Sequence, residues 1–118
     1  MPRIMVVDDN DLVLKMMAGL LEEEGYEVRA FPDAAFALES ALDDIELIVT
    51  DLDMPTPGEA LIQQVRRESD IPIIVVSGNI SEERAQFLRN IGAQTVLEKP
   101  FSLSGFLETI RQFSPVSP

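Results

Sequence analysis

The chain has 118 residues, of which 46% are apolar, and this length and composition suit one domain with a single packed core. Its formal net charge of −12, from 21 acidic and 9 basic residues, argues against direct binding of nucleic acid or of an anionic membrane, because both depend on Lys and Arg. The chain has no Cys, no His, no apolar run near the roughly 20 residues of a membrane span and no signal-peptide pattern, which excludes disulfides, thiolate or imidazole metal sites and His-dependent hydrolysis and predicts a cytoplasmic protein.

Short apolar runs rich in β-branched residues alternate with helical patterns, beginning with a run at 4–7. Residues 11–24 predict an amphipathic helix, with Asp11 as its N-cap and Gly25 at its end. Its apolar face is expected to contain Leu12, Val13, Met16, Met17, Leu20 and Leu21.

The middle of the chain repeats this alternation. A run at 28–31 precedes a helix that Asp33 caps and that extends to about Leu42. A third run, at 47–50, precedes a helix that begins at Pro57, since proline suits a first helical turn. The apolar positions of this helix are Leu61, Ile62 and Val65.

The last two runs, at 73–76 and 95–97, each precede a helix that starts with a serine. Ser81, followed by two glutamates, begins the fourth helix, which ends near Gly92. Ser102 begins the fifth helix. The inner face of the fifth helix is expected to contain Leu103, Phe106, Leu107 and Ile110.

Five strands alternating with five helices predict an α/β fold, because right-handed crossovers place such strands in one parallel sheet. Three of the runs are apolar almost throughout, which is typical of strands buried on both faces. We expect a single five-stranded parallel sheet, order 2-1-3-4-5, with the five helices on its two faces, the flavodoxin-like arrangement. Residues 1–113 would form this domain, and the Pro/Ser-rich residues 114–118 would form a linker or a disordered tail.

Polar residues follow four of the runs, at the strand ends where ligands bind in open parallel sheets. They are Asp8 and Asp9, Asp51 and Asp53, Ser77 and Gly78, and Lys99 and Pro100. Turn or cap chemistry explains each of them singly. It does not explain why acids, a hydroxyl and a lysine should converge at one edge of the sheet.

Several carboxylates in one cleft repel one another, and Lys99 alone cannot balance them. Carboxylates without His or Cys select a hard cation, namely Mg²⁺, Mn²⁺ or Ca²⁺. A hydroxyl and an ammonium beside such an ion suit phosphate oxygens. The pattern therefore indicates phosphoryl transfer, with one aspartate as the nucleophile that forms an acyl phosphate.

The ordered set of motifs resembles the receiver domain of two-component response regulators over roughly residues 3 to 113. The motifs are Asp8-Asp9, Asp51 in Asp-x-x-Met-Pro, Ser77-Gly78 and Lys99-Pro100-Phe101. The resemblance implies that Asp51 accepts a phosphoryl group from the phosphohistidine of a sensor histidine kinase or a phosphotransfer protein, with acetyl phosphate as a further donor. It implies no enzymatic activity beyond this transfer and autodephosphorylation. The phosphorylated protein would change conformation and signal to a partner or an output domain.

The resemblance also implies a metal site. Asp8 and Asp9, the carboxylate of Asp51 and the backbone carbonyl of Asp53 would hold Mg²⁺, or Mn²⁺ in its place.

The remaining motif residues would act on the phosphoryl group. Ser77 would donate a hydrogen bond to it, pulling the loop that contains Gly78, and Lys99 would pair with it. The Lys99–Pro100 peptide bond would be cis, which costs little before proline.

The chain departs from the family pattern in places. Val96 stands where the family commonly has an aromatic residue that changes rotamer on activation, and the single tyrosine, Tyr26, lies near the second run. The segment Thr56-Pro57-Gly58 places a glycine one residue earlier than is usual, which predicts a short, stiff loop over the site. Asp53 and Asn79 stand where receivers vary their dephosphorylation rate.

Other interpretations stay open at this point. A degenerate receiver would serve as a phosphorylation-independent binding or dimerisation module. A haloacid dehalogenase-like phosphatase would use Asp51-Leu52-Asp53, although Pro55 stands where its signature has Thr or Val. The chain suits a stand-alone receiver or a fragment of a longer regulator or hybrid kinase, and a homodimer through the fourth and fifth helices is an option.

Overall fold

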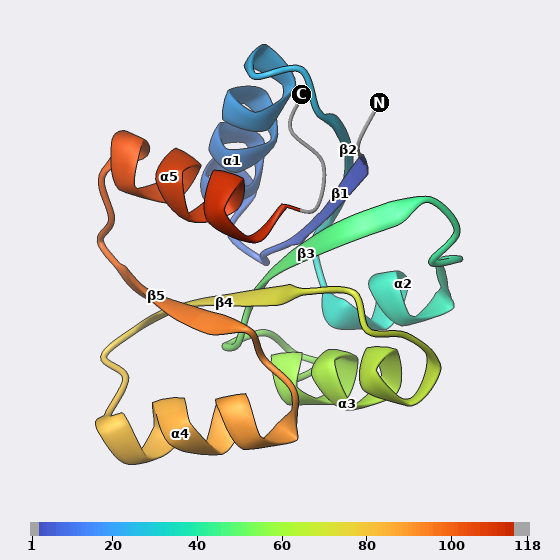
Figure 1. Cartoon of the computed structure of the whole chain (residues 1–118), viewed down its shortest axis with the longest axis vertical. Coiled ribbons are helices and arrows are strands. Elements are labelled where there is room, and N and C mark those ends of the chain that lie inside the picture. Colours follow the sequence, from blue (N-terminus) through green and yellow to red (C-terminus); the bar gives the residue numbers. More distant parts are fainter. Residues whose placement is uncertain (1–2, 115–118) are drawn as a thin grey trace.

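The computed structural model describes residues 3–114, and strands and helices alternate throughout this range (Figure 1). The elements are β1 (Arg3–Val7), α1 (Asp11–Glu23), β2 (Glu27–Phe31), α2 (Ala34–Glu39), β3 (Ile45–Asp51), α3 (Gly58–Glu68), β4 (Ile73–Gly78), α4 (Glu82–Ile91), β5 (Thr95–Lys99) and α5 (Leu103–Phe113). The predicted order of five strands and five helices is confirmed.

All five strands are parallel and lie in the order β2-β1-β3-β4-β5, as predicted. The central strands β1, β3 and β4 are buried almost throughout, whereas the edge strands β2 and β5 are partly exposed. This difference explains why the runs for the central strands are continuously apolar: helices cover both of their faces.

The helices divide between the two faces of the sheet, with α1 and α5 on one side and α2, α3 and α4 on the other (Figure 1). Each face has its own apolar core. On the α1/α5 side the largest fully buried side chains are Ile4, Met17, Leu21, Leu47, Ile74 and Phe106. On the other side they are Met5, Ile48, Leu61, Ile62, Ile73 and Leu88.

The prediction that Asp11 caps α1 is wrong. The cap is Asn10, whose side-chain oxygen accepts from the N–H groups of Leu12 and Val13 at 3.0 and 3.1 Å. Asn10 has the extended backbone that a cap residue needs, while Asp11 is already inside the first helical turn and pairs with Lys15 at 3.0 Å. The carboxylate of Asp11 still lies at the favourable end of the helix dipole.

The other predicted caps are confirmed, since Asp33, Ser81 and Ser102 each accept a backbone N–H of their own helix. Helix α1 is followed by Gly25 at φ 96°, and α4 ends at Gly92 with φ 125°. Helix α2 is shorter than predicted and ends at Glu39 rather than near Leu42. Ser40 adopts an extended backbone, which turns the chain toward β3 and lets Leu42 pack against the core.

The inward face of α1 also differs from the prediction. Met17 and Leu21 are buried as expected, but the third buried residue is Leu14. Leu12 and Met16 are exposed by 79% and 39%, because the helix is rotated so that positions 14, 17 and 21 face the sheet. A four-residue repeat was therefore only an approximate guide to the buried face.

The predicted tail at 114–118 falls outside the described residues except for Ser114, whose N–H donates to the carbonyl of Ile110 and ends α5. Within residues 3–114 no helix combines the length and the apolar character that a membrane crossing requires.

Helix α5 offers a test of the core. Phe106 and Ile110 are buried, as expected, but Leu103 is 52% exposed and does not belong to the inner face as predicted. Phe106 also stacks on Phe101, with ring centroids 5.3 Å apart. We expect Phe106→Ala to lower the free energy of unfolding by about 3–5 kcal/mol, through lost burial and a residual cavity. Leu103→Ala on the same helix should change it by less than about 0.5 kcal/mol. Urea unfolding would measure both, and equal losses would contradict this account of the core.

Candidate functional site

The polar residues singled out from the sequence lie at the carboxyl ends of four parallel strands. Asp8 follows β1 directly. Three strands run further than the apolar runs suggested: β3 ends with Asp51, β4 includes Ser77 and Gly78, and β5 ends with Lys99. These residues are therefore held by the sheet itself, because the hydrogen-bonded ladder fixes the backbone at each of them.

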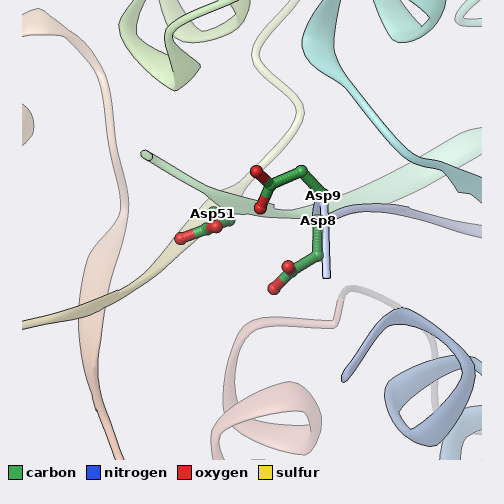
Figure 2. Close-up of side chains that lie close together, drawn as sticks. All are labelled: Asp8, Asp9 and Asp51. Carbon is green, nitrogen blue, oxygen red and sulfur yellow. The ribbon is translucent and has the colours of Figure 1, made fainter. Parts of the chain in front are cut away.

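Three carboxylates form one acidic group. Oxygens of Asp8, Asp9 and Asp51 all lie within 4.8 Å of one another. Figure 2 shows the three side chains extending toward the same side of the strand ends. Asp8 and Asp51 are buried, with 0% and 5% exposure, whereas Asp9 is exposed. Two anchored, buried carboxylates and one accessible one are a donor set that fits a hard divalent cation with remaining water ligands.

Asp53 is not part of this acidic group among the described residues, and its side chain is exposed.

Lys99 supplies the nearest positive charge. Its Nζ lies 3.2 Å from Oδ2 of Asp8 and 3.6 Å from Oδ1 of Asp51. The bond to Asp8 joins the ends of β1 and β5, two strands that are not neighbours in the sheet. One ammonium thus faces two buried carboxylates, and a negative charge remains in excess at the site.

The excess of negative charge affects the pKa of Asp51. Burial raises the pKa of Asp51, and the charge of Asp8 raises it further. The ammonium of Lys99 and the backbone N–H groups of Leu52 and Asp53 offset part of this increase in the pKa. Leu52 donates to Oδ1 of Asp51 at 2.9 Å, which also fixes the orientation of the carboxylate.

Ser77 borders the site from β4. It is 4% exposed, and its hydroxyl donates to the carbonyl of Gly78 at 3.2 Å. The loop after β4 contains Asn79 in the left-handed region, with φ 56°. Beside Ser77 lies a cavity of about 200 Å³. Its lining residues are Leu52, Asp53, Ser77, Gly78, Asn79, Ile80 and Arg84.

The segment between β3 and α3 folds tightly back on the end of β3. The carbonyl of Leu52 accepts from both Met54 and Gly58, at 3.1 and 3.2 Å. Gly58 packs so closely that a Cβ at this position would lie 2.4 Å from the carbonyl oxygen of Asp51. That same oxygen accepts from the hydroxyl of Thr50 at 2.8 Å. The segment therefore buttresses the backbone of Asp51 directly.

Asp33 tethers this segment to α2, a role that its sequence position as a helix cap did not reveal. One oxygen accepts from Ala35 and caps α2, while the other accepts from the N–H of Thr56 at 3.0 Å. Partial burial acts to raise the pKa of Asp33, but the hydrogen bonds from Thr56 and from the start of α2 outweigh it and hold the pKa below its ordinary value.

Two further sequence expectations concern β5 and the residue after it. The Lys99–Pro100 peptide bond is cis, as predicted. Val96 lies on β5, partly buried against the core on the α2/α3/α4 side, so the position expected to lack an aromatic ring carries a short branched side chain. Tyr26 is 4% exposed in the core of the opposite face.

A test of the buttress uses two glycines. Gly58→Ala should lower the free energy of unfolding by about 1–3 kcal/mol, because the new methyl group must displace the backbone of Asp51 or Leu52. Gly19→Ala is the matched control: it lies inside α1 with nothing within 4 Å of the added Cβ, so it should raise stability by roughly 0.5–1 kcal/mol. Denaturant unfolding would decide, and a neutral or stabilising Gly58→Ala would be inconsistent with the close approach.

A second test concerns the charge on Asp51. Since its pKa is raised in the folded protein, the ionised carboxylate opposes folding at pH 7, and this penalty disappears as the pH falls through the folded-state pKa toward the unfolded value. Without divalent ions, Asp51→Asn should therefore be more stable than wild type at pH 7, with a smaller difference near pH 4. Asp70→Asn, at an exposed acid away from the site, is the control. A less stable Asp51→Asn at pH 7 would refute the electrostatic account.

The comparisons with known proteins agree on one family. Residues 4–111 match the model of the response regulator receiver domain. Response regulator RR06 of Streptococcus pneumoniae is 34% identical over 110 residues, which are 92% of this chain and 51% of RR06. The polar-differentiation response regulator DivK of Brucella anthropi is 29% identical over 119 residues, covering 96% of this chain and 97% of DivK.

The fold agrees with solved receiver domains as well. The solution structure of the beryllofluoride-activated NtrC4 receiver domain dimer superposes with a TM-score of 0.89 at 33% identity, covering 97% of each chain. The chain spans about half the length of RR06 and nearly all of DivK. None of these matches favours the phosphatase or the binding-module interpretation. The chain belongs to the response regulator receiver domain family, the phosphoacceptor domains of two-component signal transduction.

Proposed function

We propose that Asp51 is the phosphoacceptor of this receiver domain. One observation carries the proposal: the Asp51 carboxylate is buried at the end of the central strand β3, 3.6 Å from Lys99 and within the acidic group. A carboxylate oxygen of Asp51 would attack the phosphorus of a phosphohistidine. The new P–O bond forms as the P–N bond breaks, and the electron pair of the P–N bond leaves with the imidazole of the donor.

The metal site supports the same chemistry. Asp8, Asp9 and Asp51, together with the backbone carbonyl of Asp53, would hold Mg²⁺, or Mn²⁺ in its place. When bound, the cation would offset the negative charge that the acidic group and the phosphoryl oxygens bring together. Lys99 already contacts Asp8 and Asp51, and its ammonium would pair with an oxygen of the transferred group.

Ser77 would connect the chemistry to the conformation. Its hydroxyl now donates to Gly78, and it would exchange that carbonyl for a phosphoryl oxygen. Such a shift pulls on the segment with Gly78 and Asn79, which leads into α4. Asp53 and Asn79 both line the cavity beside the acceptor, where they would set the access of water and hence the autodephosphorylation rate.

The donor and the output depend on the same assignment. We infer a sensor histidine kinase or phosphotransfer protein as donor, a small acyl phosphate as a further donor, and no turnover of other substrates. Residues 1–113 would act as one unit in the cytoplasm, with 114–118 as a linker or a disordered tail. The NtrC4 receiver domain is a dimer when activated by beryllofluoride, which supports a homodimer here too.

Phosphorylation of the purified protein tests the acceptor. Incubation with acetyl phosphate and Mg²⁺ should add one phosphoryl group per chain, detected by intact-protein mass spectrometry, and EDTA should abolish it. Asp51→Asn should remove the label. Asp53→Asn is the matched control, since its side chain is exposed outside the acidic group and it should still be labelled.

Two results would overturn the assignment. Equal labelling of Asp51→Asn would place the acceptor elsewhere. Steady release of phosphate from many equivalents of a phosphoester would point to the phosphatase chemistry instead.

A further inference from the structure

An ion pair joins α3 to α4 beside the acceptor. The guanidinium of Arg84, on α4, donates to the carboxylate of Glu59, on α3. The two helices are neighbours on the same face of the sheet (Figure 1). Both side chains keep partial contact with solvent, with exposures of 47% for Arg84 and 23% for Glu59. An exposed pair of this kind contributes little to stability by itself, so its place in the fold is the more informative feature.

Each partner is anchored to the site through the backbone. Glu59 follows Gly58, the glycine that packs against the carbonyl of Asp51. On the other side, the N–H of Arg84 donates to the hydroxyl of Ser81 at 3.1 Å, at the end of the loop that follows β4. The ion pair thus connects the segment that follows Asp51 with the loop that follows Ser77. A shift of either segment would move one partner of the pair.

The cavity of about 200 Å³ opens between these two segments. Among the described residues that line it, Arg84 is the only basic one, and Ser77 and Asp53 line it as well. Lys99 borders a separate cavity of about 350 Å³, lined mostly by apolar side chains of α1 and the β5–α5 connection. Lys99 thus contacts the carboxylate of Asp51 directly, whereas Arg84 lines the cavity on the side of Ser77.

Phosphorylation changes the balance of charge at this place. The phosphoryl group of an acyl phosphate carries nearly two negative charges and three acceptor oxygens, in place of the single charge of the Asp51 carboxylate. Lys99 is already shared between Asp8 and Asp51. A guanidinium binds phosphate oxygens with two parallel N–H donors, and the phosphoryl group carries more negative charge than the single, partly exposed carboxylate of Glu59.

We propose that Arg84 is a phosphoryl-binding residue of this receiver, which releases Glu59 and reaches through the cavity to the phosphoryl group on Asp51. Glu59 competes with the phosphoryl group for Arg84 and so favours the unphosphorylated state. The exchange loosens α4 from α3 as Ser77 draws on the same loop. This inference rests on the proposed function of Asp51 as the acceptor.

Two variants that break the same ion pair separate this role from a structural one. The affinity for beryllofluoride, a stand-in for the phosphoryl group, would be measured by calorimetry with Mg²⁺ in the intact chain. Arg84→Gln should weaken binding by about threefold to tenfold, the range of a partly exposed charge-assisted bond. Glu59→Gln should tighten binding, because it frees Arg84. The double variant should behave like Arg84→Gln, and Arg84→Lys should recover part of the affinity.

The controls address folding and remote charge. Arg111 and Glu24 form a comparable exposed pair between α5 and the end of α1, so Arg111→Gln should leave beryllofluoride affinity unchanged. Thermal unfolding should show that Arg84→Gln and Glu59→Gln both stay folded with only small changes in stability, because each loses the same partly exposed ion pair. Affinity changes of opposite sign in these two folded variants would support the transfer of Arg84 from Glu59 to the phosphoryl group.

The outcomes also distinguish the two proposals. If both variants shift the affinity in the same direction, or if Arg84→Gln binds as wild type does, Arg84 is a structural residue and the inference is wrong while the acceptor stands. If wild type binds no beryllofluoride, or if Asp51→Asn binds it equally well, the proposed function fails and this inference fails with it.

Discussion

The carboxylates of Asp8 and Asp51 are buried side by side, and the contacts around them hold these two charges close together. Burial raises the pKa of Asp51, repulsion from the charge of Asp8 raises it further, and both effects oppose folding with the carboxylate ionised. The ammonium of Lys99 bridges both carboxylates, but one charge does not neutralise two. The site is therefore short of positive charge, which suits the divalent cation that is proposed to bind there.

The rigidity of the surroundings maintains this unfavourable arrangement. Asp51 is the last residue of a central strand and pairs with Val76 of β4, while its neighbour Thr50 pairs with Val7 of β1, so the sheet fixes the backbone here. The carbonyl of Asp51 accepts from Thr50 and is covered by Gly58, while the N–H of Leu52 orients its carboxylate. A side chain held in this way cannot turn away from its neighbours to relieve the repulsion. The Asp51 carboxylate is thus preorganised before a ligand binds.

The site is much less constrained on the side of β4. Ser77 is buried, but the residues after it form an exposed loop with a left-handed Asn79, and α4 begins with exposed side chains. Because Val96 offers no ring that could follow a movement of this loop, a polar connection is a reasonable carrier of the signal. The pair of Glu59 and Arg84 lies where such a connection would be effective, between a rigid α3 segment and the more exposed start of α4.

The sequence alone determined the α/β class, the strand order, most helix caps and which residues meet at the strand ends. These features arise from local periodicity, turn chemistry and the fixed hand of the crossovers, so they can be predicted from the sequence. Tertiary structure decided the rest. The cap at Asn10, the rotation of α1 that exposes Leu12, the tether from Asp33 to Thr56 and the pairing of Glu59 with Arg84 depend on how elements pack in space. Residues some 25 positions apart meet only once helix rotation and loop path are set by the core, and no local pattern records that geometry.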